Sequence, residues 1–375
     1  MGEEPFSSFL KKYFAQHKKY GSKDRKQISH LCYCYFRLGK ALPEKLAEER
    51  MLIALFLCSS QSNEILEHLR PEWNEKIHLP FEDKCSMLNV QYSMFKLFPF
   101  TDELSKGIEQ EKFILSYLQQ PDLFIRLRPG YEISVKEKLQ KEGIVFTQVS
   151  DKCLALPNSF KIEDVIKLNK EAVVQDYSSQ RTAELLFNLK SKISNPKFSV
   201  WDCCAASGGK SIMLYDLYPD IDLSVSDIRD SILHNLRKRF SDAGIKKYKS
   251  FVTDLTTFHS PPAIHHSPFD LIICDAPCSG SGTWGRTPEQ LLYFEKSKID
   301  YYALVQRKIV SNIYGHLKPG GYLIYITCSV FKKENEEVVN YMRQYLKLEL
   351  IQVKLLKGYN LNADTMFAAL LRKQL

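Results

Sequence analysis

The second half of the chain, from about residue 170, alternates short apolar runs with longer segments in which apolar residues recur at helical spacing. The predicted strands are FSVWDCC, IDLSVSD, KSFVTD, FDLIICD and GGYLIYITC, and the predicted helices run through KSIMLYDLY, SILHNLRKRF and IDYYALVQRKIVSNIYGHL. Strands separated by helices are typical of a parallel sheet with helices on both faces. The pattern therefore predicts a doubly wound α/β domain.

The first half follows a different pattern. ISHLCYCYFRLGKAL and RMLIALFLCSS place apolar residues at helical spacing, whereas LFIRLRPG, ISVKEKLQKEG, GIVFTQV and CLALPNS predict a strand, a helix and two further strands. We therefore predict three domains: a helical domain over 1–110, a small α/β domain over 111–165, and the doubly wound domain over 166–375.

Acidic residues close the predicted strands of the last domain. They are Asp202, Asp227, Asp254 and Asp275, and Cys328 closes a further strand. Any one of these acids can be explained as a helix N-cap. Because ligands bind beyond the carboxyl ends of the strands in such sheets, the set as a whole predicts a ligand site there.

The first of these strand ends continues into a glycine-rich loop, 202-DCCAASGGKS-211. The loop is similar to a phosphate-binding P-loop, but that motif requires glycine where Cys204 stands, which argues against a nucleoside triphosphatase. Asp227, at the next strand end, suits the hydroxyl groups of a ribose. This pattern alone leaves a nicotinamide cofactor and S-adenosylmethionine open.

Composition and charge narrow the picture only in part. The 375 residues carry a net charge of +8, with 44% hydrophobic and 26% charged residues, and no apolar run reaches the length of about 20 residues that spans a bilayer. Seven lysine and arginine residues between positions 11 and 26 face only Asp24, which fits either phosphate contacts or a solvated helix face. The ten cysteines form no CxxC pair, so we expect no metal site and a reducing, cytoplasmic location.

Two cysteine stretches, DAPCSGSGT and YITCSVFKKENEEVV, follow neighbouring strands. Together with VQDYSSQ, CAASGGK and LKPGGYLIYITCS, they resemble the Sun/RsmB-type RNA cytosine-5 methyltransferases over residues 170–375. SKDRKQISHLCYCYFRLG resembles the NusB-like helical domain of the bacterial RsmB-like members, and LFIRLRPG with KLQKEGIVFTQV resembles the small, RRM-like domain that precedes their catalytic core. The resemblance implies a Rossmann-like class I methyltransferase domain that uses S-adenosyl-L-methionine.

The resemblance also implies how the two cysteines divide the chemistry. A thiolate that adds to carbon 6 of cytosine makes carbon 5 nucleophilic, and elimination later expels the thiol. DNA cytosine-5 methyltransferases use the cysteine of the Pro-Cys stretch, whereas the Sun/RsmB-type enzymes attack with the cysteine of Thr-Cys. We therefore assign Cys328 as nucleophile and Cys278 to product release, with Asp275 and Lys210 contacting the base or the cofactor without apportioning them.

The cofactor contacts are carried over from the same resemblance. Asp227 is expected to hold the ribose hydroxyls, Asp254 the adenine amino group, and Asp275 to lie near the methionine end. The loop expected to wrap the methionine and ribose parts consists of Cys204, Ala205, Ala206, Ser207, Gly208, Gly209 and Lys210. Ser207 departs from the usual proline, and Thr365-Met366-Phe367 departs from a usual Gly-Phe-Phe.

The resemblance implies an RNA substrate, and a base is flipped out at least cost from a loop or bulge. The basic N-terminal segment and the pair Arg126 and Arg128 are candidate RNA-docking positions. The resemblance of the helical N-terminal domain to that of the bacterial RsmB-like members favours small-subunit ribosomal RNA over transfer RNA. A DNA methyltransferase would not explain Thr327-Cys328, and a non-catalytic RNA-binding assembly factor would not need the intact cysteines and acids. No membrane contact is expected, and the oligomeric state stays open.

Overall fold

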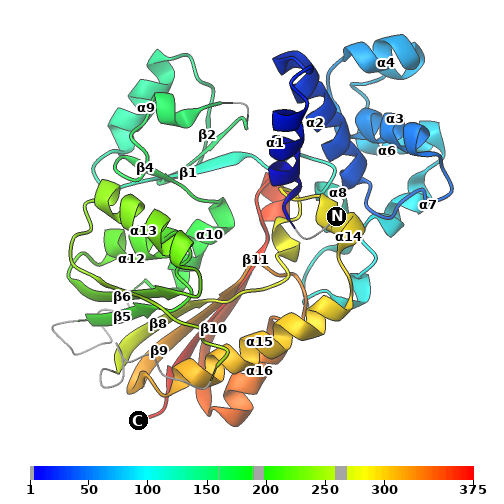
Figure 1. Cartoon of the computed structure of the whole chain (residues 1–375). Coiled ribbons are helices and arrows are strands. Elements are labelled where there is room, and N and C mark those ends of the chain that lie inside the picture. Colours follow the sequence, from blue (N-terminus) through cyan, green and yellow to red (C-terminus); the bar gives the residue numbers. More distant parts are fainter. Residues whose placement is uncertain (1–3, 159, 188, 190–197, 258–267) are drawn as a thin grey trace. The chain divides into compact units, whose positions relative to one another are not determined.

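The computed structural model describes residues 4–158, 160–187, 189, 198–257 and 268–375 (Figure 1). These residues divide into two compact units, of which one comprises Met1–Leu104, Ile108–Gln120 and Thr283–Lys296, and the other Ser105–Gly107, Pro121–Gly282 and Ser297–Leu375. Among the described helices, none combines the length and the apolar character required to cross a bilayer. The finer division into domains 1–110, 111–165 and 166–375 stays a prediction.

The first unit is helical. Its elements are α1 (Phe6–Gln16), α2 (Ser22–Arg37), α3 (Ala47–Cys58), α4 (Glu64–Leu69), α5 (Pro71–Asn74), α6 (Phe81–Leu88), α7 (Gln91–Met94), η1 (Phe95–Leu97), η2 (Thr101–Glu103), α8 (Gln110–Ser116) and α14 (Glu289–Tyr293). The carboxylate of Asp24 accepts the backbone N–H of Gly21 at 2.9 Å, which caps the start of α2.

A segment from far along the chain completes this helical unit. Trp284 is fully buried, and its ring lies 5.8 Å from that of Phe98 and 4.7 Å from that of Phe294. The carboxylate of Glu289 accepts the backbone N–H of Phe6 at 3.0 Å. The buried guanidinium of Arg37 donates to the carbonyl oxygen of Gly285 at 3.0 Å. Residues 283–296 therefore belong to the core of a unit whose other helices lie before residue 120.

The second unit contains a small antiparallel sheet of order β2-β3-β1-β4. Its elements are β1 (Leu123–Leu127), α9 (Glu132–Lys141), β2 (Thr147–Ser150), β3 (Cys153–Leu156), η3 (Ile162–Asp164) and β4 (Ala172–Val174). Val135 and Leu139, one helical turn apart on α9, pack with Ile125 and Leu127 of β1. The predicted strand–helix–strand–strand order over this region is present.

The large sheet of the second unit has the order β10-β11-β9-β8-β5-β6-β7. Its elements, with the turns that lead into it, are α10 (Tyr177–Arg181), η4 (Thr182–Leu185), β5 (Phe198–Asp202), α12 (Gly209–Leu217), β6 (Ile221–Asp227), α13 (Asp230–Ala243), β7 (Lys249–Val252), β8 (Phe269–Asp275), η6 (Ser281–Thr283), α15 (Ser297–Tyr314), β9 (Leu317–Thr327), α16 (Glu336–Tyr345), β10 (Leu348–Leu356), η7 (Gly358–Leu361) and β11 (Met366–Lys373). The strands β5 to β9 run parallel, and β11 pairs antiparallel with β9 and β10.

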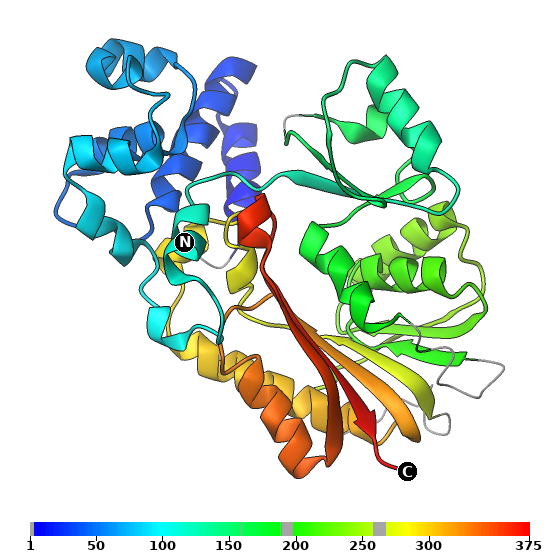
Figure 2. The same cartoon turned by 180° about the vertical axis from the view of Figure 1, so that it is seen from behind.

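Helices cover both faces of this sheet, with α12 and α13 on one side and α15 and α16 on the other (Figures 1 and 2). Alternate residues of each strand enter the two cores, as the period of two in a strand requires: Ile324 of β9 packs in the α12–α13 core, and Leu323 and Tyr325 pack in the α15–α16 core. This arrangement confirms the predicted Rossmann-like doubly wound fold.

The edge of the sheet differs from the sequence-based expectation. The strands β10 and β11 were not predicted, and they add an antiparallel pair to a sheet that was expected to be parallel. Alternate residues of β11 enter the cores on the two faces of the sheet, with Ala368 in one and Ala369 in the other, so MFAALL shows no alternation of apolar and polar positions. A short continuous apolar run of this kind does not distinguish a strand from a buried helix.

Candidate active site

The carboxyl ends of the parallel strands surround one pocket of about 400 Å³ in the second unit. The pocket is lined by Cys203, Cys204, Ala206, Asp227, Ile228, Arg229, Thr253, Asp254, Leu255, Thr256, Asp275, Ala276, Pro277, Cys278, Tyr302, Ile309 and Cys328. The structure thus brings together the predicted residues from five strand ends, because the ends of parallel strands meet at one edge of the sheet.

The glycine-rich loop between β5 and α12 is held by its backbone. Ala206 has a positive φ of 46°, and its N–H donates to the Asp227 carboxylate at 3.0 Å. Gly208 has φ +83°, and a Cβ there would lie 2.6 Å from the ring of Phe240, so only glycine fits. Ser207 points toward α13, where its hydroxyl and carbonyl oxygens accept from Arg239 at 2.6 and 3.0 Å.

The remaining predicted loop residues support the pocket from behind. Ala205 is buried and its N–H donates to the carbonyl oxygen of Ser226 at 2.9 Å, and Gly209 begins α12. Cys204 and Ala206 therefore face the pocket, whereas Ala205, Ser207, Gly208 and Gly209 set the path of the loop.

Asp227 and Asp254 line the pocket, and each carboxylate already accepts hydrogen bonds from protein groups. The carboxylate of Asp227 accepts the Arg229 backbone N–H and side-chain Nε, each at 3.0 Å, as well as the N–H of Ala206. Arg229 is more than half exposed, so its side chain has room to move. Asp254 accepts from the backbone and the hydroxyl group of Thr256 at 2.8 and 2.7 Å, which fixes one of its oxygen atoms.

Asp202, one of the four strand-end acids of the predicted ligand site, lies beneath the loop and had been assigned no specific contact. Its Oδ2 atom accepts from the Ser211 hydroxyl group at 2.6 Å, and its Oδ1 atom is buried without a hydrogen-bond partner among the described residues. Burial raises the pKa of Asp202 to about 7, with the hydrogen bond from Ser211 opposing the shift. A buried acceptor with no protein partner fits the underside of a site built for a polar ligand.

Lys210 and Asp275 form a close ion pair at the edge of the pocket. The two charged atoms lie 2.6 Å apart, and the Lys210 ammonium group also donates to the hydroxyl group of Ser179 at 3.3 Å. Burial opposes the charge of Lys210, but the Asp275 carboxylate outweighs it, so the pKa of Lys210 is raised. The Cys328 thiol acts on the pKa of Lys210 in the same direction.

The sulfur atoms of Cys278 and Cys328 lie 3.3 Å apart. Both side chains are partly exposed and line the pocket. The hydrogen bond to Cys328 and burial hold the pKa of Cys278 well above that of an ordinary thiol. Cys278 therefore keeps its proton and can donate it to the sulfur of Cys328.

A buried hydrogen-bond network joins the two cysteine-bearing loops. The Glu334 carboxylate accepts from the Ser279 backbone at 2.9 Å and from the Ser329 hydroxyl group at 2.8 Å, one residue beyond each cysteine. The Gln306 amide of α15 donates to the same carboxylate and to the Pro277 carbonyl oxygen, both at 3.0 Å. Burial raises the pKa of Glu334, and these hydrogen bonds oppose the shift.

Gly282 fixes the same two loops through the backbone. Its N–H donates to the carbonyl oxygen of Cys328 at 2.8 Å, and its own carbonyl oxygen accepts from Thr365 at 2.9 Å. A Cβ at this position would lie 1.9 Å from the carbonyl oxygen of Thr365, so a side chain is excluded. The departure from the family pattern at Thr365 therefore lies directly against the loop of Cys278.

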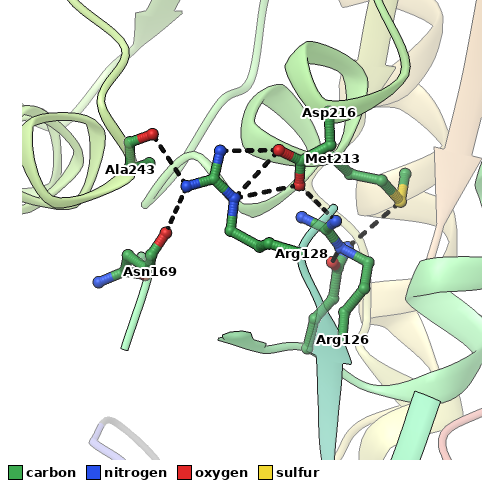
Figure 3. A network of polar contacts seen from close by, with 7 residues as sticks. Arg126, Arg128, Asn169, Met213, Asp216 and Ala243 are labelled. Carbon is green, nitrogen blue, oxygen red and sulfur yellow. Dashed lines mark hydrogen bonds and ion pairs between the residues drawn. The ribbon is translucent and has the colours of Figure 1, made fainter. Parts of the chain in front are cut away.

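The pair Arg126 and Arg128 does not form an RNA-docking surface, and that interpretation was wrong. Both side chains are buried, and their guanidinium groups lie 2.6 and 2.7 Å from the carboxylate of Asp216 on α12 (Figure 3). Arg128 also donates to the carbonyl oxygens of Asn169 and Ala243, each at 2.8 Å. The two arginines therefore join the small sheet to the helices of the large one.

The basic side chains near the N-terminus, in contrast to Arg126 and Arg128, are exposed to solvent. The lysines on α1, on α2 and between these two helices are exposed, namely Lys11, Lys12, Lys18, Lys19, Lys23 and Lys26. Lys12 and Lys23 form surface ion pairs with Glu4 and Glu64, each at 2.7 Å, and such exposed pairs contribute little to stability. This surface stays available to an anionic partner.

Some residues of the site have signals that residue-level reasoning did not use. Glu334 lies in the stretch ENEEVV beside the Thr-Cys motif, but no role was assigned to this acid. Tyr302 and Arg229 enter the pocket from α15 and from the turn before α13. No spacing rule connects these two with the pocket, because only the folded sheet brings their segments to one edge.

The second unit has a Rossmann-like doubly wound fold, with its pocket at the carboxyl ends of the parallel strands. Residues 187–371 match the family model described as 16S rRNA methyltransferase RsmB/F. Over these residues the chain is similar to the Sun/RsmB-type family of RNA methyltransferases, in line with the resemblance of its motifs.

Individual relatives support this assignment. The chain is 27% identical, over 61% of its length and 52% of the relative, to "Ribosomal RNA small subunit methyltransferase B" of Xanthomonas campestris pv. campestris, so it spans about half the length of this curated relative. The structure titled "Crystal Structure of PH0851" superimposes with a TM-score of 0.70 at 20% identity, covering 97% of this chain and 93% of the other. NSun6 from Pyrococcus horikoshii, solved with SFG, superimposes with a TM-score of 0.59 at 15% identity, covering 71% and 94% of the two chains. These two structures show the shared fold.

Proposed function

We propose that this protein transfers a methyl group from S-adenosyl-L-methionine to carbon 5 of a cytosine in RNA. The observation that carries the proposal is the pair of thiols Cys278 and Cys328, 3.3 Å apart in the pocket that also contains Asp275. A pocket that only bound RNA would have no use for two adjacent thiols of which one is held in its protonated form.

The residues around the pocket fit the cofactor. Asp227 would accept from the ribose hydroxyl groups once Arg229 moves aside, and Asp254 has a second carboxylate oxygen for the adenine amino group. The free Oδ1 atom of Asp202 offers an acceptor for the ammonium group of the methionine part. When bound, S-adenosyl-L-methionine supplies an electrophilic methyl group.

We assign the attack on carbon 6 of cytosine to the Cys328 sulfur atom. The Cys278 sulfur atom lies 3.3 Å from that sulfur, within hydrogen-bond distance. The bond between Cys328 and carbon 6 breaks the conjugation of the ring and makes the adjacent carbon 5 enamine-like and therefore nucleophilic. Asp275 would hydrogen-bond the N3/N4 edge of the base, or the cofactor, and Lys210 would neutralise the charge that develops there.

Cys278 is assigned to the release of the product. Its pKa is raised chiefly by the Cys328 thiol beside it. Once the sulfur of Cys328 is bonded to carbon, it carries no negative charge, so Cys278 can release its proton to water and, as a thiolate, accept the proton from carbon 5. The bond between Cys328 and carbon 6 then breaks, and the electron pair returns to the sulfur atom. The two thiols would thus act in succession.

The substrate we propose is small-subunit ribosomal RNA, with transfer RNA as the alternative within the same chemistry. The curated relative of Xanthomonas campestris is named for the small ribosomal subunit, and the exposed lysines of α1 and α2 suit a phosphate backbone. All ten cysteines have free thiols, in keeping with a reducing cytoplasm. A non-catalytic RNA-binding assembly factor is the competing function.

The test is transfer of a labelled methyl group to total cellular RNA by the wild-type chain, Cys328→Ala and Cys278→Ala, with Cys32→Ala of the helical unit as the control. We expect 5-methylcytosine with wild type and control, none with Cys328→Ala, and RNA covalently trapped on Cys278→Ala. Trapped RNA on Cys328→Ala instead would reverse the two roles. RNA binding without any label in RNA from the wild-type chain would favour the assembly factor.

A further inference from the structure

We propose that Cys203, Cys204 and Cys274 form a binding site for one thiophilic metal ion, of which Zn²⁺ is the physiological candidate, in the wall of the pocket. The three sulfur atoms all lie within 4.8 Å of one another. This cluster is separate from the pair Cys278 and Cys328.

The sheet creates this cluster from two distant segments. β5 and β8 are adjacent parallel strands, and the backbone N–H of Cys203, just after β5, donates to the carbonyl oxygen of Ile273 at 2.9 Å. Cys203 thereby lies beside Cys274, the penultimate residue of β8. The chain turns after Cys203, which brings the next sulfur, that of Cys204, to the same place.

The chemistry of three thiols selects the metal. Thiolates bind soft or borderline ions such as Zn²⁺ and Cd²⁺ in preference to Mg²⁺ or Ca²⁺. With Zn–S bonds of about 2.3 Å in tetrahedral geometry, sulfur atoms lie about 3.8 Å apart, so the observed cluster needs to contract by roughly 1 Å at most. Three protein ligands leave one coordination position open.

A metal ion can reach the three-cysteine cluster from the pocket, and acidic residues lie beside the cluster. Cys203 and Cys204 line the pocket, and Cys204 is partly exposed, so the open position faces the pocket. Asp202 precedes Cys203 and Asp275 follows Cys274 in the sequence, so an acidic residue lies beside the cluster on each of the two strands.

The alternative for these cysteines is packing, since Cys203 and Cys274 are buried among apolar side chains. Packing explains the small side chains of Cys203 and Cys274, but it requires no third sulfur atom, that of Cys204, at the pocket wall. Because the site shares the pocket with Asp227 and Cys328, we expect a bound ion to weaken the binding of S-adenosylhomocysteine. This consequence rests on the proposed function, whereas the metal site itself does not.

The experiment uses the reduced, chelator-treated full chain carrying Cys278→Ala and Cys328→Ala, which removes the other close thiol pair. Titration with Cd²⁺ should produce a thiolate-to-cadmium absorption band that saturates at one ion per chain. X-ray absorption of the Zn²⁺-loaded chain should show three sulfur ligands at about 2.3 Å. Adding Cys274→Ala should abolish the band, whereas adding Cys153→Ala, a buried thiol of the small sheet, should leave it unchanged.

Two results would overturn the proposal. One is a coordination shell of bound Zn²⁺ that lacks three sulfur ligands. This measurement uses the chain with an intact cluster, so it does not depend on whether the Cys274→Ala variant folds. The other is an unchanged cadmium band after Cys274→Ala. If the metal-free chain did not bind S-adenosylhomocysteine, that result would contradict the proposed function but not the metal site.

Discussion

The sulfur atoms of Cys278 and Cys328 lie 3.3 Å apart although 50 residues separate them in the sequence. The hydrogen bond between them is the largest cause of the raised pKa of Cys278, ahead of burial. The ionisation of one thiol therefore depends on the chemical state of the other.

Replacing Cys328 by alanine should make Cys278 easier to ionise, because both the hydrogen bond and the neighbouring charge disappear. We expect Cys278 to react several times faster with iodoacetamide at a fixed, mildly alkaline pH, since the thiolate is the reacting form. Peptide mass spectrometry measures the rate, with half-exposed Cys32 as the internal reference. An unchanged rate at Cys278 would show that burial alone holds its proton.

Asp202 should make stability depend on pH between its unfolded and folded pKa values, about 4 and about 7. In this window the unfolded chain loses the Asp202 proton while the folded chain retains it, so the free energy of unfolding falls as pH rises. The slope from one such group is about 1.4 kcal/mol per pH unit.

The measurement is urea unfolding of the wild-type chain and Asp202→Asn across this window. The difference in stability between the two should move in favour of the variant as pH rises, because asparagine has no charge to bury. Asp222→Asn, at an exposed position on β6, should follow the wild type. A difference that stays constant with pH would mean that Asp202 is not the titrating group.

Glu334→Gln should damage the alignment of the two cysteine loops. Every partner of Glu334 found in this network donates a hydrogen bond, so an amide NH₂ group would face a donor on one side. Leaving such a buried donor unsatisfied costs about 1–3 kcal/mol. We expect thermal unfolding at lower temperature and a lower kcat for methyl transfer with little change in KM. Glu337→Gln, whose ion pair with Arg307 is 3.5 Å long and partly exposed, is the matched control and should change neither value. A loss of equal size in both variants would argue against the network.

Asp216→Asn should destabilise the second unit strongly. It removes the carboxylate from two buried guanidinium groups, those of Arg126 and Arg128 (Figure 3). Breaking a buried ion pair from one side costs about 3–5 kcal/mol. Chemical unfolding followed by circular dichroism would measure this cost. Asp300→Asn, which loses only an exposed ion pair with Lys333, should cost less than about 1 kcal/mol.

Features that arise from residues close together in the sequence could be predicted, whereas contacts between distant segments could not. The strands that end in Asp202, Asp227 and Asp275 follow from local apolar runs, and the pocket follows because parallel strands end at one edge. The side chains of Arg126 and Arg128 carry no local sign of burial, since their partner Asp216 lies on a helix of the other sheet. The cluster of Cys203, Cys204 and Cys274 likewise requires β5 and β8 to be neighbours.

The position of Trp284 and Glu289 in the helical unit has a consequence for the synthesis of the chain. The ribosome makes proteins from the N-terminus, so α1 and α2 emerge long before residues 283–296, which complete their core. The first helices made are therefore among the last to reach their final packing. Until then, the apolar faces of α1 and α2 are exposed to chaperones and to neighbouring chains, while the strands of the small sheet already have all their pairing partners.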